Sequence, residues 1–174
     1  MGKLSRKELT EHYQGLRGVA RHITSNVLVA GGLTGIRLSE INRSALAHAA
    51  NWTNRKVGWD WAAMHRRWKK RPRHISLAIW IDPDLCCLLL GQVSDGRIVA
   101  RIDRLERAPH VNKDQFASAI VVARTYLDTL GRLAGCRQAV VWEPFSTLIP
   151  HYKLAGFTSE IVMKGKIVGL KYDL

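Results

Sequence analysis

The segment 97–157 constrains the fold of this chain more than any other, because it combines a strand, a long helix and a second strand. Residues 97–106 alternate between apolar and polar side chains, as strands do, and Pro109 lies just beyond the end of this run. Apolar residues then recur every three or four positions over residues 114–133, which indicates a helix with one buried face. Residues 138–142 form the second expected strand. This order is a β-α-β crossover, and it predicts two neighbouring parallel strands.

Other parts of the chain have the same two periodicities. Alternating or continuous short apolar runs predict strands, and apolar residues three or four positions apart predict helices. We expect strands at residues 34–41, 74–81, 85–93, 159–163 and 166–172. We expect helices at residues 42–52 and 61–70. Together these elements predict an α/β fold with a mixed, mostly antiparallel central sheet that contains the β-α-β crossover.

The N-terminal region has a basic helical pattern. Residues 1–30 predict a basic helical extension and residues 33–174 the core, so we expect one domain over residues 1–174. The apolar run 27–30 precedes two glycines, and we interpret it as a turn or the start of a strand. No apolar run approaches the ~20 residues that a membrane-spanning helix needs, and no secretory signal is visible. We therefore expect a cytoplasmic protein with reduced cysteines and no membrane partner, and we leave a homodimer open.

The positive charge is concentrated in the first part of the chain. The formal net charge is +13, and residues 1–74 hold 15 of the 27 Lys/Arg but only 4 of the 14 Asp/Glu. This part therefore has a net charge of +11, and the remainder has only +2. Such asymmetry favours an anionic partner, above all nucleic acid or a substrate linked to it. The alternative is a solvated face that keeps the protein soluble.

A run of basic residues closes the second expected helix. Trp52, Trp59, Trp61 and Trp68 lie near it in the sequence, and aromatic rings stack on unpaired bases while cations neutralise phosphates. Because Trp61, Met64 and Trp68 have helical spacing, we expect most of these rings to belong to the core. The predicted nucleic-acid-binding residues are Arg66, Arg67, Lys69, Lys70, Arg71 and Arg73.

The end of the crossover segment contains a short motif. Its last six residues, from Tyr152 to Phe157, have the pattern Y-x-x-x-G-F. This pattern, one strand after a long helix, resembles the ending of the core of the GCN5-related N-acetyltransferase (GNAT) superfamily. The resemblance covers residues 33–174. It implies the acyl-CoA N-acyltransferase fold, in which acetyl-coenzyme A lies in a V-shaped opening between two parallel strands.

The resemblance also implies a place for the cofactor, acetyl-CoA or another acyl-CoA. The superfamily signature Gln/Arg-x-x-Gly-x-Gly/Ala binds pyrophosphate with backbone amides at the start of the long helix. Here Ala117 fits the last position, but Asn112 replaces Gln/Arg and Gln115 replaces the first glycine. The alternative is an ordinary helix start that Asn112 or Asp114 caps, with no ligand. The implied cofactor-binding residues are Leu105, Arg107, Asn112, Lys113, Gln115, Phe116 and Ala117.

Three residues are candidates for catalysis. Tyr152 matches the family tyrosine that protonates the departing thiolate; otherwise its ring only packs the last helix on the sheet. Glu143 and Glu106, at the ends of the two parallel strands, are candidates for the base that takes a proton from the attacking amine. Each could instead be a surface carboxylate paired with Arg104 or Arg107. We expect no metal site, because the histidines are scattered and the cysteines lack C-x-x-C spacing.

The sequence therefore predicts an N-acetyltransferase-like enzyme. The resemblance implies that an acetyl or related acyl group moves from coenzyme A to an amine. The charge suggests an acceptor linked to nucleic acid, namely a tRNA, a ribosomal component or a DNA base. One alternative is a nucleic-acid-binding protein of the same fold that has lost or altered its use of acetyl-CoA. Others are a Mom-like DNA base modification enzyme and a small-molecule acetyltransferase.

Overall fold

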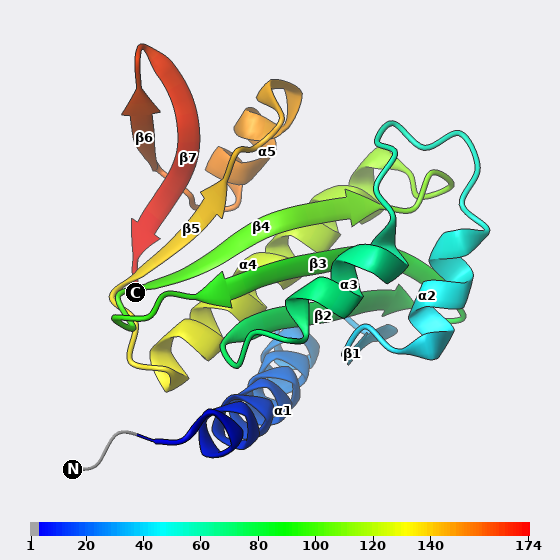
Figure 1. Cartoon of the computed structure of the whole chain (residues 1–174). Helices are drawn as coiled ribbons and strands as arrows, with labels where there is room; N and C mark the ends of the chain where they lie inside the picture. Colours follow the sequence, from blue (N-terminus) through cyan, green and yellow to red (C-terminus); the bar gives the residue numbers. More distant parts are fainter. Residues whose placement is uncertain (1–3) are drawn as a thin grey trace.

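The computed structural model describes residues 4–174, without the side chains of Lys113 and Phe116. These residues form a seven-stranded sheet in the order β1-β2-β3-β4-β5-β7-β6 (Figure 1). The strands are β1 (Ile36–Ser39), β2 (His74–Ile81), β3 (Asp84–Val93), β4 (Val99–Arg107), β5 (Gln138–Trp142), β6 (Ser159–Met163) and β7 (Lys166–Asp173). Of the described strand pairs, β4 and β5 alone are parallel. The predicted mixed, mostly antiparallel sheet with a β-α-β crossover is confirmed.

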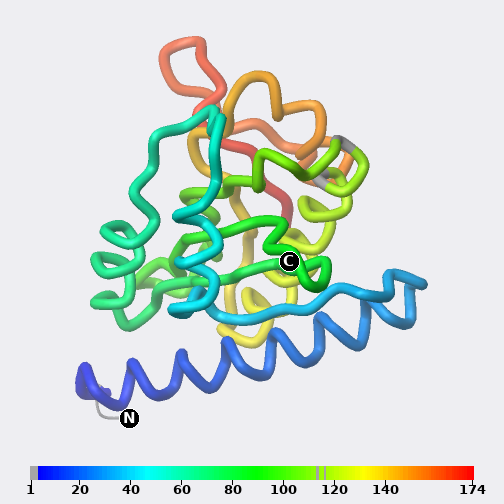
Figure 2. The backbone as a smooth tube through the Cα atoms, turned by 90° about the vertical axis from the view of Figure 1, so that its right-hand side faces the viewer, coloured from blue at the N-terminus to red at the C-terminus, as the bar shows by residue number. Residues whose placement is uncertain are grey.

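Helices lie on both sides of this sheet. They are α1 (Arg6–Ala30), α2 (Arg43–Ala50), α3 (Trp61–Trp68), α4 (Lys113–Leu133) and α5 (Ile149–Leu154), with a 3-10 turn at Ser146–Leu148. Viewed edge on, α2 and α3 lie on one side and α4 on the other, while α1 crosses below and contacts α4 and β1 (Figure 2). In the described part of the chain, no helix has the length and apolarity needed to cross a membrane.

The helices cover the two faces of the sheet unequally. On the α4 face, side chains of β2 to β5 and β7 pack with α1 and α4 in one cluster that includes Leu89 and Leu127. On the α2/α3 face, the buried cluster includes Trp61, Trp80 and Leu90. Among the described residues, this second cluster contains side chains of β2 and β3 but none of β4 or β5. The strands β2 and β3 are therefore apolar on both faces, whereas no described side chain of β4 or β5 joins an apolar cluster with α2 and α3.

The helix α1 continues through the apolar run that precedes Gly31. The interpretation of residues 27–30 as a turn or the start of a strand is wrong, because Leu28 is only 4% exposed and packs in the core as part of this helix. The helix ends at Gly31, whose N–H donates to the carbonyl of Val27 at 3.0 Å. Consequently β1 begins later and is shorter than the expected strand at residues 34–41.

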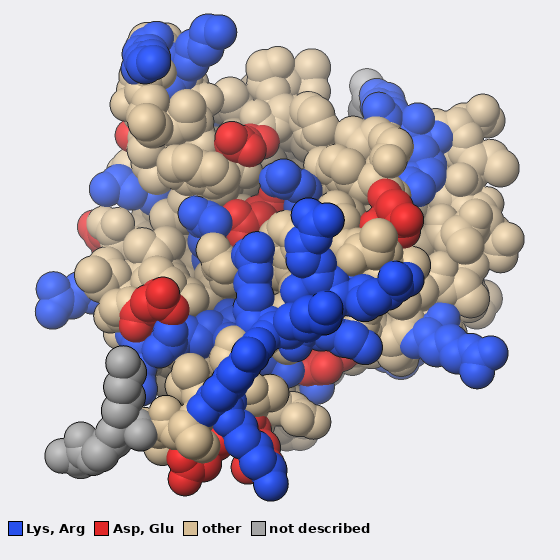
Figure 3. Space-filling view, in the orientation of Figure 1, with Lys and Arg blue, Asp and Glu red and all other residues tan. Residues whose placement is uncertain are grey.

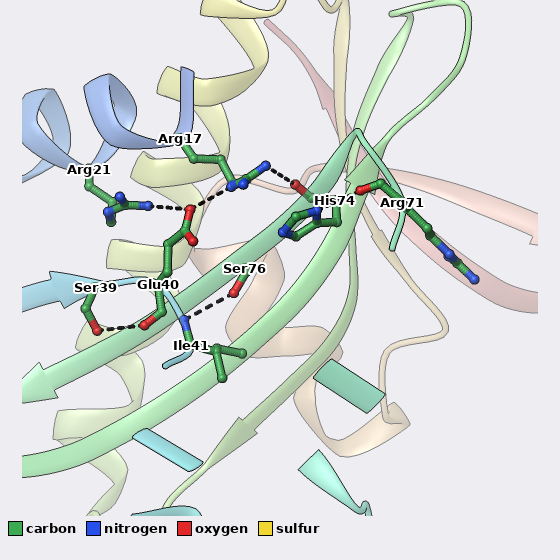
Figure 4. Close-up of polar contacts among 8 residues, drawn as sticks. All are labelled: Arg17, Arg21, Ser39, Glu40, Ile41, Arg71, His74 and Ser76. Carbon is green, nitrogen blue, oxygen red and sulfur yellow. Dashed lines mark hydrogen bonds and ion pairs between the residues drawn. The ribbon is translucent and has the colours of Figure 1, made fainter. Parts of the chain in front are cut away.

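Partly buried ion pairs attach α1 to the residue that follows β1 (Figure 4). Arg17, which is 3% exposed, donates from Nε to Glu40 Oε1 at 2.8 Å and from Nη1 to the carbonyl of His74 at 3.2 Å. Arg21 donates to the same carboxylate oxygen at 3.2 Å. Burial opposes the ionisation of Glu40, but hydrogen bonds and charge from Arg17 and Arg21 outweigh it, so the pKa of Glu40 is lowered. The predicted basic extension is thus joined to the core by polar contacts as well as apolar ones.

Candidate active site

The parallel strands β4 and β5 part before β4 ends. They pair in register from Val99 with Gln138 to Ile102 with Val141. Beyond this point β4 continues to Arg107 with no described partner in β5. The backbone groups on this edge of β4 therefore lack ladder hydrogen bonds to β5, and a V-shaped opening begins here.

A bulge in β4 lies where the two strands part. Gly91 of β3 pairs with Ile102, and the residue before Gly91 pairs with Arg104, so Asp103 has no cross-strand partner. A Cβ atom at Gly91 would lie 1.9 Å from the carbonyl oxygen of Arg101, which a side chain at this position cannot tolerate. Bulges bend a strand and change the direction of its side chains. The bulge at Asp103 therefore turns the end of β4 away from β5.

Two adjoining cavities occupy this region. The smaller, of about 30 Å³, is lined by Asp103, Glu143 and Tyr152 together with neighbouring apolar and aromatic groups. The larger, of about 580 Å³, is lined by residues 54–57 of the loop between α2 and α3 and by the end of β4. The residues that line both cavities are Leu105, Phe145 and Leu148. The two cavities thus share walls at the end of β4, and we call them together the channel.

The structure brings Tyr152 to this channel. Its side chain lies in α5, is 3% exposed, and meets the ring of Phe157 edge to face at 5.9 Å between centroids. Burial, together with nearby Cys87, raises the pKa of Tyr152, so its hydroxyl stays protonated at neutral pH. No hydrogen bond joins this hydroxyl to another described residue, and the side chain lines the smaller cavity. Both the packing role and the acid role fit this position.

The candidate Glu143 also lines the smaller cavity. It follows β5 directly, is exposed, and has a φ of 48°, a left-handed conformation that is uncommon for residues other than glycine. Its N–H donates to the carbonyl of Val168 at 2.8 Å, which fixes the backbone there. Arg104, one of the two partners considered for Glu143, donates instead to the carbonyl of Asp103 at 2.6 Å.

The candidate Glu106 is buried, and both of its carboxylate oxygens accept hydrogen bonds. It is 7% exposed, and Arg55 donates to its two oxygens at 2.9 and 2.7 Å. The indole N–H of Trp61 donates to the same carboxylate at 2.5 Å. Glu106 is therefore not a surface carboxylate, and Arg55 reaches it from the loop between α2 and α3.

The predicted cofactor-binding residues divide into two groups. Leu105 and Arg107 line the larger cavity. At the start of α4, Asn112 Oδ1 accepts from the amide of Gln115 at 2.8 Å, and Gln115 Oε1 accepts from the amide of Asn112 at 3.1 Å. This reciprocal capping box uses two amides at the helix start. Ala117 is exposed on the first turn of α4. The side chains of Lys113 and Phe116, also predicted here, lie outside the described residues.

Most of the predicted nucleic-acid-binding residues lie at the end of α3 or directly after it, on the α2/α3 face, whereas Arg73 lies close to Tyr13 of α1. Arg66, Arg67, Lys69, Lys70 and Arg71 are exposed, and Arg73, half-buried, forms an ion pair with Asp95. Lys and Arg gather at the centre of this face, over α3 and the strands beside it (Figure 3). Of the four neighbouring tryptophans, Trp61 is buried, and the other three are half-buried against the same core cluster. The expectation that most of these rings pack in the core is therefore confirmed only in part.

The sequence reasoning missed Asp103. Its side chain is 9% exposed, Oδ1 pairs with Arg101 at 2.7 Å, and Oδ2 is buried without a described hydrogen-bond partner beside the smaller cavity. Burial raises the pKa of Asp103 against the opposing charges of Arg101, Arg104 and Arg71. A local pattern in the sequence could have indicated this site. Two consecutive polar residues, Asp103 and Arg104, interrupt the alternation of apolar and polar side chains, as happens at a bulge.

These features together define a class of fold. A mixed sheet whose two parallel strands part at a β4 bulge, followed by a short helix that places a tyrosine in the opening, is that of an acyl-CoA N-acyltransferase. The chain has the fold of the GNAT superfamily, as the resemblance implied. Its sequence matches no protein-family model and none of the curated proteins.

Solved structures with this fold are similar to the chain at low sequence identity. The GNAT domain of S. lividans PAT superposes with a TM-score of 0.60 at 14% identity, covering 80% of this chain and 90% of that one. The PaiA N-acetyltransferase from Thermoplasma acidophilum, in complex with coenzyme A, gives 0.56 at 11% identity, covering 80% and 99%. The ribosomal-protein-S18-alanine N-acetyltransferase from Escherichia coli gives 0.55 at 14%, covering 78% and 90%.

Proposed function

We propose that this protein is an acyltransferase that moves an acetyl or related acyl group from coenzyme A to an amine on an acceptor linked to nucleic acid. The observation that carries the proposal is the parting of β4 and β5 beside the buried ring of Tyr152. The names of the similar structures support it, since two are N-acetyltransferases and one of these was solved with coenzyme A.

The channel suits the arm of an acyl-CoA. Leu105, Phe145 and Leu148 give it apolar walls, and about 580 Å³ is within the range of small-molecule sites. The edge of β4 after Ile102 offers backbone N–H and C=O groups to the amides of a pantetheine arm. A bound acyl-CoA supplies the acyl group as an activated thioester.

The start of α4 offers fewer hydrogen-bond donors to the phosphates of an acyl-CoA than the superfamily signature implies. The amides of Asn112 and Gln115 are already bonded within the capping box, so fewer donors at the start of α4 face a pyrophosphate. Lys56 and Arg107 line the larger cavity and supply positive charge close to the channel. We infer that these two cations contribute to holding the phosphates, together with the amides that remain.

The side chains of the smaller cavity have the groups that the two proton transfers need. Glu143, or the buried carboxylate of Asp103, takes one proton from the attacking amine nitrogen. Nitrogen forms a bond to the acyl carbon as the carbon–sulfur bond breaks, and the Tyr152 hydroxyl donates its proton to the sulfur. Glu106 is the weaker candidate for the base, because Arg55 and Trp61 hold both of its oxygens.

The charge distribution supports the acceptor class. The exposed cations that end α3 lie on the same face of the sheet as Arg104, which lines the smaller cavity and lies over Trp59 of that face. A polyanion bound there would lie next to the place where an acceptor amine must enter. A tRNA, a ribosomal component and a DNA base all meet this requirement.

A second candidate function is favoured by the capping box of α4. Because Asn112 and Gln115 satisfy each other without a ligand, a nucleic-acid-binding protein that no longer uses acetyl-CoA would have the same helix start. Isothermal calorimetry with acetyl-CoA, followed by transfer of radiolabelled acetyl groups to total tRNA, ribosomes and DNA, separates the two candidates. Binding with transfer supports the enzyme, and absence of binding at high protein concentration supports the second candidate.

A further inference from the structure

The α2/α3 face carries three arginine–tryptophan pairs, one at the end of α3 and two over β4 and β5. The guanidinium carbon of Arg71 lies 4.6 Å from the ring centroid of Trp68. That of Arg101 lies 5.4 Å from Trp142, and that of Arg104 lies 5.5 Å from Trp59. We call these six residues the arginine–tryptophan row.

The row is continuous from α3 to the channel. Arg71 donates from Nη1 to the side chain of Gln92 at 3.0 Å, and Gln92 is the cross-strand partner of Arg101. Arg101 pairs with Asp103, and Arg104 donates to the carbonyl of Asp103 at 2.6 Å. The residues that carry the charge therefore follow one another across β3 and β4 toward the opening.

The row ends on stacked rings at the mouth of the channel. Trp59 and Phe145 stack with 6.2 Å between centroids and 25° between their planes. Both rings and Arg104 line the smaller cavity, and Phe145 is 49% exposed. An aromatic group entering along the row would reach this pair immediately beside Asp103 and Tyr152.

Access to the row follows from the fold. The helices α2 and α3 bury side chains of β2 and β3 in an apolar cluster, whereas β4 and β5 carry the half-buried side chains of Arg101, Arg104 and Trp142 on this face (Figure 1). Arg71 is exposed, the Arg101 side chain is 30% exposed, and the three tryptophans of the row are half-buried. Each pair thus presents a cation and part of an aromatic ring together.

A row of arginines next to partly exposed tryptophan rings is expected to bind unpaired nucleic acid in preference to paired nucleic acid. Arginines spaced along a groove neutralise phosphates of either form, whereas exposed rings gain energy only from bases that are free to stack on them. A duplex keeps its bases stacked inside, and a solvated basic face needs no rings at all. We propose that the arginine–tryptophan row binds the unpaired strand of a nucleic acid and leads its end to the channel. This inference specifies the proposed acceptor class and in that respect rests on it.

Binding measured without acyl-CoA tests the row separately from catalysis. Fluorescence anisotropy is recorded with labelled single strands of about 12 nucleotides, as RNA and as DNA, and with the duplexes of the same sequences. We expect single strands to bind about tenfold or more tightly than duplexes and to quench the tryptophan fluorescence. The comparison of RNA with DNA identifies the sugar of the partner.

Variants then locate the binding. We expect Trp142→Leu and Arg71→Lys, the second of which keeps its charge, to weaken single-strand binding about fivefold or more. Arg71→Gln should weaken it further, whereas Arg137→Gln, the same change in charge at the other end of β5, should not. Circular dichroism checks that each variant is folded.

Three results would overturn the inference. They are equal affinity for single strands and duplexes, no affinity for nucleic acid, or single-strand binding that the row variants leave unchanged while Arg137→Gln weakens it. None of these results depends on acetyl transfer. If the protein acetylates a small amine but fails this test, the proposed acyltransferase activity stands and the proposed strand binding by the row is wrong. If the protein passes this test but does not bind acetyl-CoA, only the proposed acyltransferase activity is wrong.

Discussion

Arg55, in the loop between α2 and α3, holds both carboxylate oxygens of Glu106 at the end of β4, at 2.9 and 2.7 Å. The two residues are 51 positions apart in the sequence. The contact ties the loop that lines the larger cavity to the strand that forms its opposite wall. Glu106 therefore acts as an anchor of the channel in this structure. The carboxylates that line the smaller cavity are those of Glu143 and Asp103.

Loss of Arg55 should destabilise the fold. In Arg55→Ala the carboxylate of Glu106, 7% exposed, stays buried without its cation, and we expect a loss of about 3 kcal/mol in the free energy of unfolding. Arg37→Ala is the matched control, because its ion pair with Asp82 is about half exposed and should contribute less than about 1 kcal/mol. Urea unfolding measures both, and equal losses would show that Arg55 does not anchor Glu106.

The hydroxyl of Tyr152 should matter for turnover and not for stability. Because no described residue hydrogen-bonds to it, Tyr152→Phe should leave the thermal midpoint nearly unchanged while it lowers the acetyl-transfer rate about 100-fold or more. Tyr126→Phe is the control, since this hydroxyl is also buried without a described partner but does not line either cavity. If Tyr152→Phe turns over at the normal rate, the ring only packs α5 on the sheet.

The close approach at Gly91 should make this position intolerant of any side chain. The added methyl of Gly91→Ala would clash with the carbonyl of Arg101, and relieving the clash must move the bulge at Asp103. We expect a loss of about 3 kcal/mol. Gly58→Ala, where nothing lies within 4 Å of the new methyl, should change stability by less than about 1 kcal/mol. Thermal unfolding of the two variants checks this difference.

The sequence predicted the elements well where one local periodicity dominates. The strands at residues 74–81 and 138–142 have the predicted bounds. The apolar run before Gly31 was misread because four apolar residues fit a strand as well as a helix. Only the packing of Leu28 against the core decides between them.

The candidate site was harder to predict, because its geometry depends on contacts between distant residues. Tyr152 and Glu143 reach the smaller cavity because the crossover fixes where β5 ends. The anchor role of Glu106 depends on Arg55, which no local pattern connects to it. The arginine–tryptophan row likewise joins residues of α3 and the segments beside it to residues of β4 and β5, and these come together only in the folded chain.

Stability should fall in mild acid because of His74. Burial, with the charge of Arg17, lowers the pKa of His74 below 6.5, so the unfolded chain binds a proton that the folded protein does not. Stability is therefore full above about pH 6.5 and decreases as the pH falls through this value toward the lowered pKa. We expect a lower thermal midpoint at about pH 5 than at about pH 7.5, and a smaller difference in His74→Gln. Burial also lowers the pKa of His65, so the same measurement on His65→Gln shows how much of the pH dependence of stability comes from His65.

The capping box should limit the affinity for acyl-CoA. In Gln115→Gly the side chain that occupies the amide of Asn112 is removed and the backbone can approach a phosphate, so we expect tighter acetyl-CoA binding by calorimetry. The same change should cost about 1 kcal/mol of helix stability. Gln115→Ala frees the amide but keeps a Cβ atom, and it separates the two effects. An affinity that rises equally in both variants assigns the gain to the freed amide, and one that rises only with glycine assigns it to the close approach of the backbone. If neither variant gains affinity, the start of α4 does not hold the phosphates in this protein.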